Sequence, residues 1–204
     1  MTLVTLRQAL RELEDDGLLS QQPGRGTFVA EPRAAYRLDS LRGFAEDLRA
    51  QGQTVSTQIL SQAVRRPPLW VTSPLGGATG RFLRLERLRL VAGRPAVHQL
   101  SWIRGDALAA TDFSGTSLYA VLADHGVVVH RASETVRPGV LDEETAGLLG
   151  RPAGTPVFVS DRITYGLDDA PLVFDRATIL GNALEIRTER AANGLSMQWS
   201  RPFS

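Results

Sequence analysis

The feature that most constrains this chain is a pair of long segments with strand character joined by a very short turn. The segments are Phe82 to Val91 and Pro95 to Ile103, and the turn between them is Ala92-Gly93-Arg94. Strands joined by so short a connection pair antiparallel. A second hairpin of this kind is expected from Pro156 to Gly166 and Pro171 to Leu180. The chain is therefore expected to build a mainly antiparallel sheet.

Helical patterns interrupt these strands. Amphipathic stretches with capping residues predict three short helices, which run from Asp39 or Ser40 to Gln51, from Ser117 to His125 and from Asp142 to Leu149. Further strands are expected over Thr54 to Arg65 and Val127 to Arg137, and residues 67–80 are expected to form a loop with one helical turn. Hairpins interrupted by helices indicate an α+β fold.

Length and composition describe a globular protein with one substantial core and a smaller appendage, at 204 residues, 43% hydrophobic and 22% charged. No run of about 18 apolar residues occurs, and the sequence lacks the pattern of a secretory leader. We therefore expect a cytoplasmic protein without a membrane segment. The absence of cysteine removes disulfides, thiolate catalysis and cysteine-based metal sites.

All 23 basic residues are arginine, so chemistry that needs a lysine, such as Schiff-base formation, is excluded. The net charge is only +1, and residues 1–33 hold four Arg against five Asp or Glu. Any contacts to nucleic acid must therefore come from a few placed residues, because no broad basic face is available.

The N-terminal segment has the pattern of an amphipathic helix. Leu6, Leu10 and Leu13 are spaced i, i+4, i+7, which places one apolar stripe along such a helix. Gly17 is expected to end it. The opposite face carries the polar residues Arg7, Gln8 and Arg11.

A short hairpin is expected next, with Leu18 to Gln22 paired to Thr27 to Ala30 across a glycine-rich tip that holds Arg25. Helix and hairpin together resemble the second half of the winged helix-turn-helix of GntR-type repressors. In that family the recognition helix usually reads Ser-Arg-x-Thr-Val-Arg-x-Ala-Leu and the wing reads Gly-x-Gly-Thr-Phe-Val. The resemblance implies a regulator that contacts DNA through Thr5 and Arg7 in the major groove and Arg25 in the minor groove.

The same resemblance predicts an incomplete DNA-binding head. Such heads have two helices before the recognition helix, whereas nothing precedes Met1 in this sequence. Thr2 and Leu3 stand where Ser and Arg are usual. We therefore expect the chain as given to bind an operator-like duplex no better than a random duplex.

The rest of the chain resembles the UTRA effector-binding domain of the HutC subfamily, whose fold is similar to chorismate lyase. The segments that carry this resemblance are Leu85 to Leu90, Gly93 to Pro95, Thr116 to Tyr119, Pro156 to Arg162 and Pro171 to Phe174. The resemblance implies a partial winged helix-turn-helix over residues 1–30, a linker over 31–37 and an α+β UTRA domain over 38–204.

Arg87 and Arg89 are the strongest candidates for binding an effector. Residues i and i+2 of a strand point to one face, about 7 Å apart, so two guanidiniums can converge on a carboxylate or phosphate. The alternatives are an exposed strand face, or ion pairs with Glu86 and Glu134. In UTRA domains the equivalent arginine pair lines the effector pocket, and this resemblance favours ligand binding.

Ser117 and Tyr119 are further candidates for the effector site. A serine at a helix start can offer its hydroxyl to an anion, although a plain N-cap is the simpler explanation. Gln99 and Val173 stand where relatives that bind phosphorylated amino sugars carry a carboxylate, so we expect an anionic effector that is less polar elsewhere. The expected effector-binding residues are Arg87, Arg89, Gln99, Ser117, Tyr119 and Val173.

Nothing in the sequence forms a catalytic pattern. His98, His125 and His130 are not linked by a Ser-His-Asp or His-x-x-x-His spacing, and metal-ligand spacing is absent. We expect no catalytic residue, no metal and no cofactor. A chorismate-lyase-like enzyme remains an alternative, as does a sensor-only or dimerisation module without DNA binding. The preferred interpretation is a homodimeric transcription regulator, acting as a repressor, that senses a small anionic metabolite.

Overall fold

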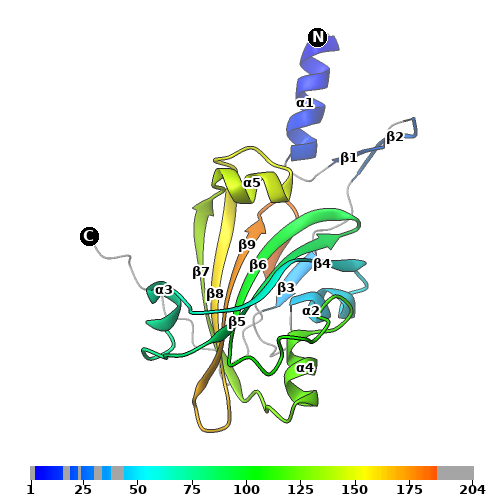
Figure 1. Cartoon of the computed structure of the whole chain (residues 1–204). Coiled ribbons are helices and arrows are strands. Elements are labelled where there is room, and N and C mark those ends of the chain that lie inside the picture. The colour runs from blue at the N-terminus through cyan, green and yellow to red at the C-terminus, as the bar shows by residue number, and fades with distance from the viewer. Residues whose placement is uncertain (1–2, 16–18, 23, 30–33, 38–43, 188–204) are drawn as a thin grey trace, which may run out of the picture.

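A computed structural model describes residues 3–15, 19–22, 24–29, 34–37 and 44–187 of the chain. Six strands form one antiparallel sheet in the order β4-β5-β6-β9-β8-β7 (Figure 1). They are β4 (Val55–Arg65), β5 (Phe82–Val91), β6 (Arg94–Arg104), β7 (Arg131–Val140), β8 (Pro156–Tyr165) and β9 (Pro171–Leu180). The predicted α+β fold with a mainly antiparallel sheet is confirmed.

The β5–β6 hairpin turns at Ala92 and Gly93, which have positive φ angles of 49° and 78°. Two successive residues with positive φ give a turn whose twist matches that of the flanking strands. The hairpin predicted from the sequence is therefore present, and β6 begins one residue earlier than expected, at Arg94.

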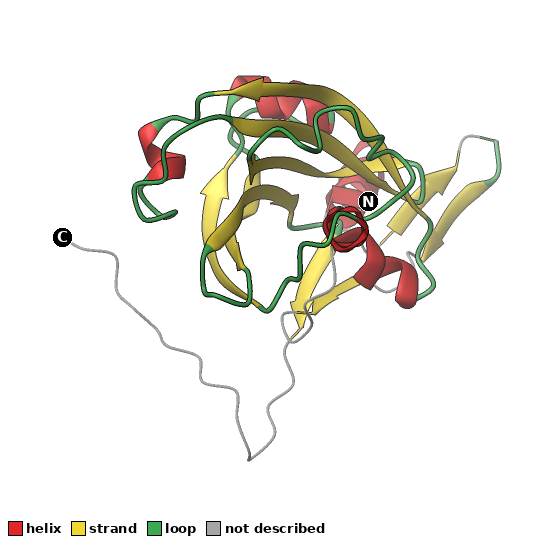
Figure 2. Cartoon of the chain, turned by 60° about the horizontal axis from the view of Figure 1, so that its bottom comes forward, coloured by secondary structure: helices red, strands yellow, loops and turns green. Residues whose placement is uncertain are grey.

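Two short helices cover each face of the sheet. α2 (Phe44–Ala50) and α4 (Leu118–Asp124) cover the inner face, defined as the face that carries Arg87 and Asp175. α3 (Leu69–Thr72) and α5 (Glu143–Leu149) cover the opposite, outer face. Figure 2 shows how strongly the sheet curves.

Apolar side chains occupy both ends of the inner face and leave its middle free for other residues. Beneath α4 the buried cluster includes Leu83, Ile103, Val173, Leu118 and Val121. Beneath α2 it includes Val97, Ile179, Ala45 and Leu48. Full burial of such a side chain contributes about 1.5–3 kcal/mol, so these few contacts hold each short helix in place.

Local capping explains where the helices begin and end. The Ser117 hydroxyl accepts a hydrogen bond from Ala120 N (3.1 Å) at the start of α4. Asp142 does the same for Thr145 N (2.7 Å) at the start of α5. Gly150, with a φ of 63°, ends α5 in the left-handed conformation that favours glycine.

β7 differs from the prediction at both ends. The expected strand was Val127 to Arg137, whereas the observed strand starts at Arg131 and continues through Pro138 to Val140. Its start is delayed because Val127 N donates to Leu122 O (2.9 Å) where the chain leaves α4. Pro138 is tolerated because β7 is an edge strand, with ladder partners on one side alone.

The N-terminal elements agree with the predicted helix and hairpin. They are α1 (Leu3–Asp15) and the antiparallel pair β1 (Leu19–Gln22) and β2 (Gly26–Val29). The predicted boundary residues Gly17, Leu18 and Ala30 lie outside the described residues. Leu6 and Leu13 are 45% and 38% exposed, so within the described residues the apolar stripe of α1 is incompletely covered.

One strand pair was not predicted. β3 (Ala34–Arg37) and β10 (Leu184–Arg187) pair in parallel, and β3 lies within the segment that we expected to be a linker. A pairing between residues so far apart in the sequence leaves no local turn signal, unlike a hairpin. In the described part of the chain, no helix has the length and apolar character needed to span a membrane.

Candidate functional site

A polar band crosses the middle of the inner face. In strand register it consists of Arg87 and Gln99 in one row and of Ser101, Asp175, Arg162 and Glu134 in the next. Alternate residues of a strand share a face, so these side chains all point towards the side covered by α2 and α4. The apolar clusters beneath those helices bound the band at both ends.

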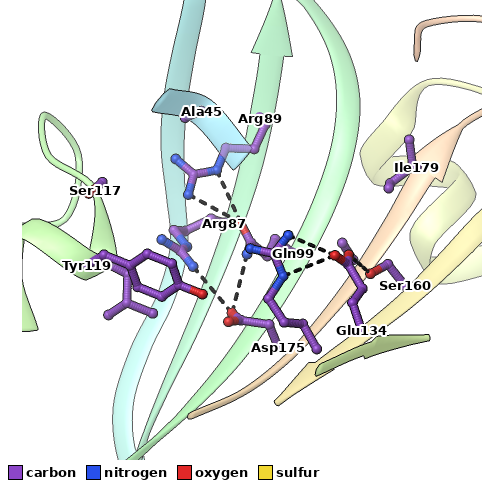
Figure 3. A pocket seen from close by; sticks show the side chains of 13 residues that line it. Ala45, Arg87, Arg89, Gln99, Ser117, Tyr119, Glu134, Ser160, Asp175 and Ile179 are labelled. Atoms are coloured by element: carbon purple, nitrogen blue, oxygen red, sulfur yellow. Dashed lines mark hydrogen bonds and ion pairs between the residues drawn. The ribbon is translucent and has the colours of Figure 1, made fainter. Parts of the chain in front are cut away.

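The polar band lines a small pocket, shown in Figure 3. The cavity is about 40 Å³, which is room for about three water molecules. Five of the six predicted effector residues line it, namely Arg87, Arg89, Gln99, Ser117 and Tyr119. The structure adds others, including Glu134, Ser160, Arg162, Asp175, Ala177 and Ile179.

Arg87 is buried at the pocket wall, with 1% of its surface exposed. Its Nη2 donates to Ser101 Oγ (2.6 Å) and lies 3.8 Å from Asp175 Oδ1. Its Nε and Nη1 are buried and have no hydrogen-bond partner among the described residues. Burial lowers the pKa of the Arg87 guanidinium, and the charge of Asp175 works against that lowering.

Arg89 is also buried, but its hydrogen-bond partners are neutral. Its Nε and Nη2 donate to Gln99 Oε1 (3.3 and 3.2 Å), and its Nη1 donates to Thr57 Oγ1. No carboxylate of the described residues forms an ion pair with it. Burial lowers the pKa of Arg89 well below its usual value, the charges of Arg87 and Arg49 lower it further, and the charge of Asp175 opposes the lowering. An anion bound at this point would also oppose it.

Both alternative interpretations of the arginine pair, an exposed strand face or ion pairs with Glu86 and Glu134, are wrong, because Arg87 and Arg89 are buried and the two glutamates pair with other residues. Glu86 lies on the other face of β5, where it pairs with Arg84 and His98, each at 2.9 Å. Glu134 pairs instead with Arg162 Nη2 (2.8 Å) and accepts a hydrogen bond from Ser160. Burial raises the pKa of Glu134 to about 7, the Ser160 hydrogen bond opposes the rise, and the charge of Asp175 adds to it.

Ser117 and Tyr119 reach the pocket from α4. The Ser117 hydroxyl serves as the N-cap, which confirms the simpler explanation of this residue although it also lines the cavity. The Tyr119 hydroxyl shares a hydrogen bond of 2.9 Å with Thr164 Oγ1. Burial raises the pKa of Tyr119, with a further contribution from the charge of Asp175.

Val173 is the predicted effector residue that does not line the pocket. Its side chain is fully buried in the apolar cluster beneath α4. The pocket carboxylates come from other positions, Asp175 two residues further along β9 and Glu134 on β7. The pocket therefore contains carboxylates at positions other than those of Gln99 and Val173, and neither residue was identified as a lining residue from the sequence.

The three histidines lie outside the pocket. His98 pairs with Glu86, the His125 ring contacts Val121 O at 2.9 Å, and the His130 backbone donates to Tyr165 O (2.9 Å). Among the described residues, His, Asp and Glu do not gather into a group that could hold a metal ion.

The predicted DNA-contacting residues lie on the N-terminal elements. Thr5 and Arg7 are exposed on α1, and Arg25 is exposed at the tip of the β1–β2 hairpin. Gln21 N donates to Glu14 Oε1 (3.4 Å), which ties the hairpin to the helix. The helix and the hairpin tip therefore belong to one supersecondary unit.

Comparison with known proteins places the chain beside transcription regulators. Residues 50–185 match the UTRA domain family. The chain is 29% identical over 168 residues to the HTH-type transcriptional repressor NagR of Bacillus subtilis (strain 168), covering 79% of this chain and 68% of NagR. It is 30% identical over 184 residues to the HTH-type transcriptional repressor PhnF of Mycolicibacterium smegmatis, covering 88% of this chain and 75% of PhnF.

A solved structure agrees with these sequence matches. The crystal structure of PhnF from Mycobacterium smegmatis has a TM-score of 0.74 and 28% sequence identity to this chain. The superposition covers 95% of this chain and 87% of that one. The similarity therefore includes the sheet that carries the pocket as well as the N-terminal elements.

Proposed function

The chain belongs to the UTRA-domain family of GntR-type transcription regulators, and we propose that its effector is a small metabolite whose carboxylate or phosphate binds Arg87 and Arg89. It is a ligand-responsive transcription regulator, because the proteins that it resembles over most of its length are transcriptional repressors. These relatives are regulators rather than enzymes, and a chorismate-lyase-like activity is not favoured.

The proposal rests on a buried arginine, Arg89, that forms no ion pair with a described carboxylate, and on N–H groups of Arg87 that have no acceptor among the described residues. Within the described residues Arg162 pairs with Glu134 and Arg87 lies near Asp175, whereas no carboxylate pairs with Arg89. Two N–H groups of Arg87 also lack an acceptor there. A buried cation that is not compensated is costly, and an oxyanion supplies both the missing charge and the missing acceptors.

The small size of the pocket suggests how effector binding could move the helices α2 and α4. A cavity of about 40 Å³ accepts a small anionic group but not a whole metabolite, since ligand sites usually span about 300–1,000 Å³. A larger effector therefore extends beyond this cavity, against α2 or α4, which line the pocket with Ala45 on one side and Leu118 and Tyr119 on the other, and we infer that it moves one of these helices. Binding thereby shifts the population of domain arrangements.

DNA is the proposed second partner. Residues 1–30 would contact DNA, with Thr5 and Arg7 in the major groove and Arg25 in the minor groove, and residues 31–37 would link them to the sensor over 38–204. We propose a homodimer whose two heads read half-sites about one DNA turn apart. Effector binding then favours a head-to-head spacing that does not fit both half-sites.

Thermal unfolding with small anions tests the proposed effector class. Acetate and inorganic phosphate should raise the unfolding free energy by about 2.7 kcal/mol at a hundred times their dissociation constant, whereas neutral acetamide should not. The shift should be lost in Arg89→Gln and kept in Arg94→Gln, which changes an exposed arginine at the β5–β6 turn. Equal shifts in all three proteins would refute binding at this pocket.

A further inference from the structure

We propose that Asp175 is a second recognition point in the pocket and accepts a hydrogen bond from a hydroxyl or ammonium group of the anionic effector. The proposal rests on the proposed function, because it concerns the same pocket. It adds to the effector class a donor group close to the anionic group.

Asp175 occupies the centre of the inner face. It is 6% exposed and lies on β9, which runs between β6 and β8 in the sheet. Its Oδ1 accepts a hydrogen bond from Ser101 Oγ. It also accepts one from Gln99 Nε2 (3.3 Å), and Arg87 Nη2 lies 3.8 Å away (Figure 3). These three neighbours all engage one carboxylate oxygen, so they fix the plane of the group.

The second oxygen of Asp175 is the unused one. No hydrogen bond from the described residues ends on Oδ2, although an ionised carboxylate accepts at both oxygens. Glu134 differs, because its Oε1 accepts from Ser160 and its Oε2 accepts from Arg162. The pocket therefore holds a fixed carboxylate with accepting capacity left over, which is the arrangement that selects a donor on a ligand.

The charge of Asp175 reaches groups on several sides of the pocket. It adds to the rise in the pKa of Tyr119 on α4 and of Glu134 on β7, and it opposes the lowering of the pKa of Arg87 on β5. Every one of these groups lines the cavity. A positively polarised ligand group entering the cavity is therefore attracted to Asp175.

The distance between the two recognition points limits the ligand. Arg87 Nη2 and Asp175 Oδ1 are 3.8 Å apart, so an oxyanion on Arg87 and a donor on Asp175 belong to neighbouring groups of one small ligand. The predicted class is a carboxylate or phosphate with a hydroxyl or ammonium on a nearby carbon. This modifies the expectation, drawn from Gln99 and Val173, of an anionic effector that is less polar elsewhere.

Three matched probes test the proposal by calorimetry on the full chain. n-Propyl phosphate offers the anion alone, glycerol 3-phosphate adds hydroxyls to the same skeleton, and O-phosphoethanolamine adds an ammonium. We expect the second and third to bind at least about tenfold more tightly than the first, as one charge-assisted hydrogen bond implies. Equal affinities for the three would overturn the role of Asp175.

Asp175→Asn sharpens the test because it keeps an accepting oxygen for Ser101 and Gln99 but turns the free oxygen into an NH₂ donor. The preference for glycerol 3-phosphate should fall to within about twofold, while n-propyl phosphate still binds. Asp161→Asn is the matched control, since Asp161 lies on the outer face of β8 and pairs with Arg176 and Arg137. A preference that survives in Asp175→Asn would contradict the proposal.

The same probes distinguish failure of the proposed effector class from failure of the proposed role of Asp175. If n-propyl phosphate and inorganic phosphate do not bind wild-type protein, the anionic effector class fails and the role of Asp175 fails with it. If they bind but the added donors bring no gain, the effector class stands and the role of Asp175 alone is refuted. The comparison in wild-type protein decides this even if Asp175→Asn does not fold.

Discussion

Arg87 and Arg89 lie two residues apart on the inner face of β5, yet Asp175 Oδ1 is 3.8 Å from Arg87 and no described carboxylate pairs with Arg89. Arg87 also donates to Ser101 at 2.6 Å. The first arginine therefore has structural partners as well as free N–H groups. The second has neutral partners, and its charge remains for a ligand.

This difference predicts opposite effects on stability. Arg87→Gln removes the cation beside buried Asp175 and should lower the unfolding free energy by about 3 kcal/mol, as breaking a buried pair does. Arg89→Gln removes a buried charge that forms no ion pair with a described carboxylate and should leave stability unchanged or increase it. Urea unfolding without added anions measures both. Equal losses in the two variants would show that Arg89 has a stabilising partner after all.

Glu134 predicts a pH dependence of stability. Its pKa is raised by burial to about 7 in the folded protein, so the folded state holds a proton that the unfolded state has released above about pH 4.5. The unfolding free energy should therefore fall as pH rises from about 4.5 to 7, by about 1–3 kcal/mol. The unfolding free energy of Glu134→Gln should change less with pH across this range. An unchanged slope in that variant would assign the effect to other groups.

Gly139 predicts a packing effect at the sheet edge. A Cβ added there would lie 2.9 Å from Val159 Cγ2, so Gly139→Ala should destabilise the protein by about 1–3 kcal/mol. The matched control is Gly147→Ala in α5, where a Cβ meets nothing within 4 Å. The control should gain up to about 1 kcal/mol from helix propensity. Chemical denaturation compares the two, and a neutral Gly139→Ala would mean that β7 shifts freely.

Arg7 and Arg25 are predicted to contribute to the salt dependence of DNA binding. Arg7→Ala and Arg25→Ala should each reduce the slope of log affinity against log salt by about one, if each loses a phosphate contact. Arg94→Ala, at an exposed position in the sensor domain, should leave the slope unchanged. Titrations of one duplex at several salt concentrations measure this. Three unchanged slopes would remove Arg7 and Arg25 from the proposed interface.

The sequence predicted the arginine pair because period-2 alternation is a local property. It missed Asp175 because Val173 and Asp175 share one face of β9, and alternation cannot say which of them lies beneath a helix. The structure decides this through α4, which covers Val173 and leaves Asp175 in the polar band. Which of the two residues lies beneath α4 depends on packing between segments about fifty residues apart in the chain, such as Leu118 and Val173.

The same limit explains the errors in the fold. Hairpins such as β5–β6 carry a turn signal and were predicted almost to the residue. The β3–β10 pair has no such signal, because its strands meet across most of the chain. The continuation of β7 through Pro138 depends on its place at the edge of the sheet, and local sequence does not reveal strand order.

The most direct test of an anion bound at the arginine pair is NMR of the arginine Nε–H groups during titration with inorganic phosphate. Arg87 Nε is buried and has no acceptor among the described residues, so its proton should move downfield as phosphate supplies one. The Nε–H of exposed Arg94 should stay in place. An Arg87 signal that does not move while phosphate reaches millimolar concentrations would contradict the account.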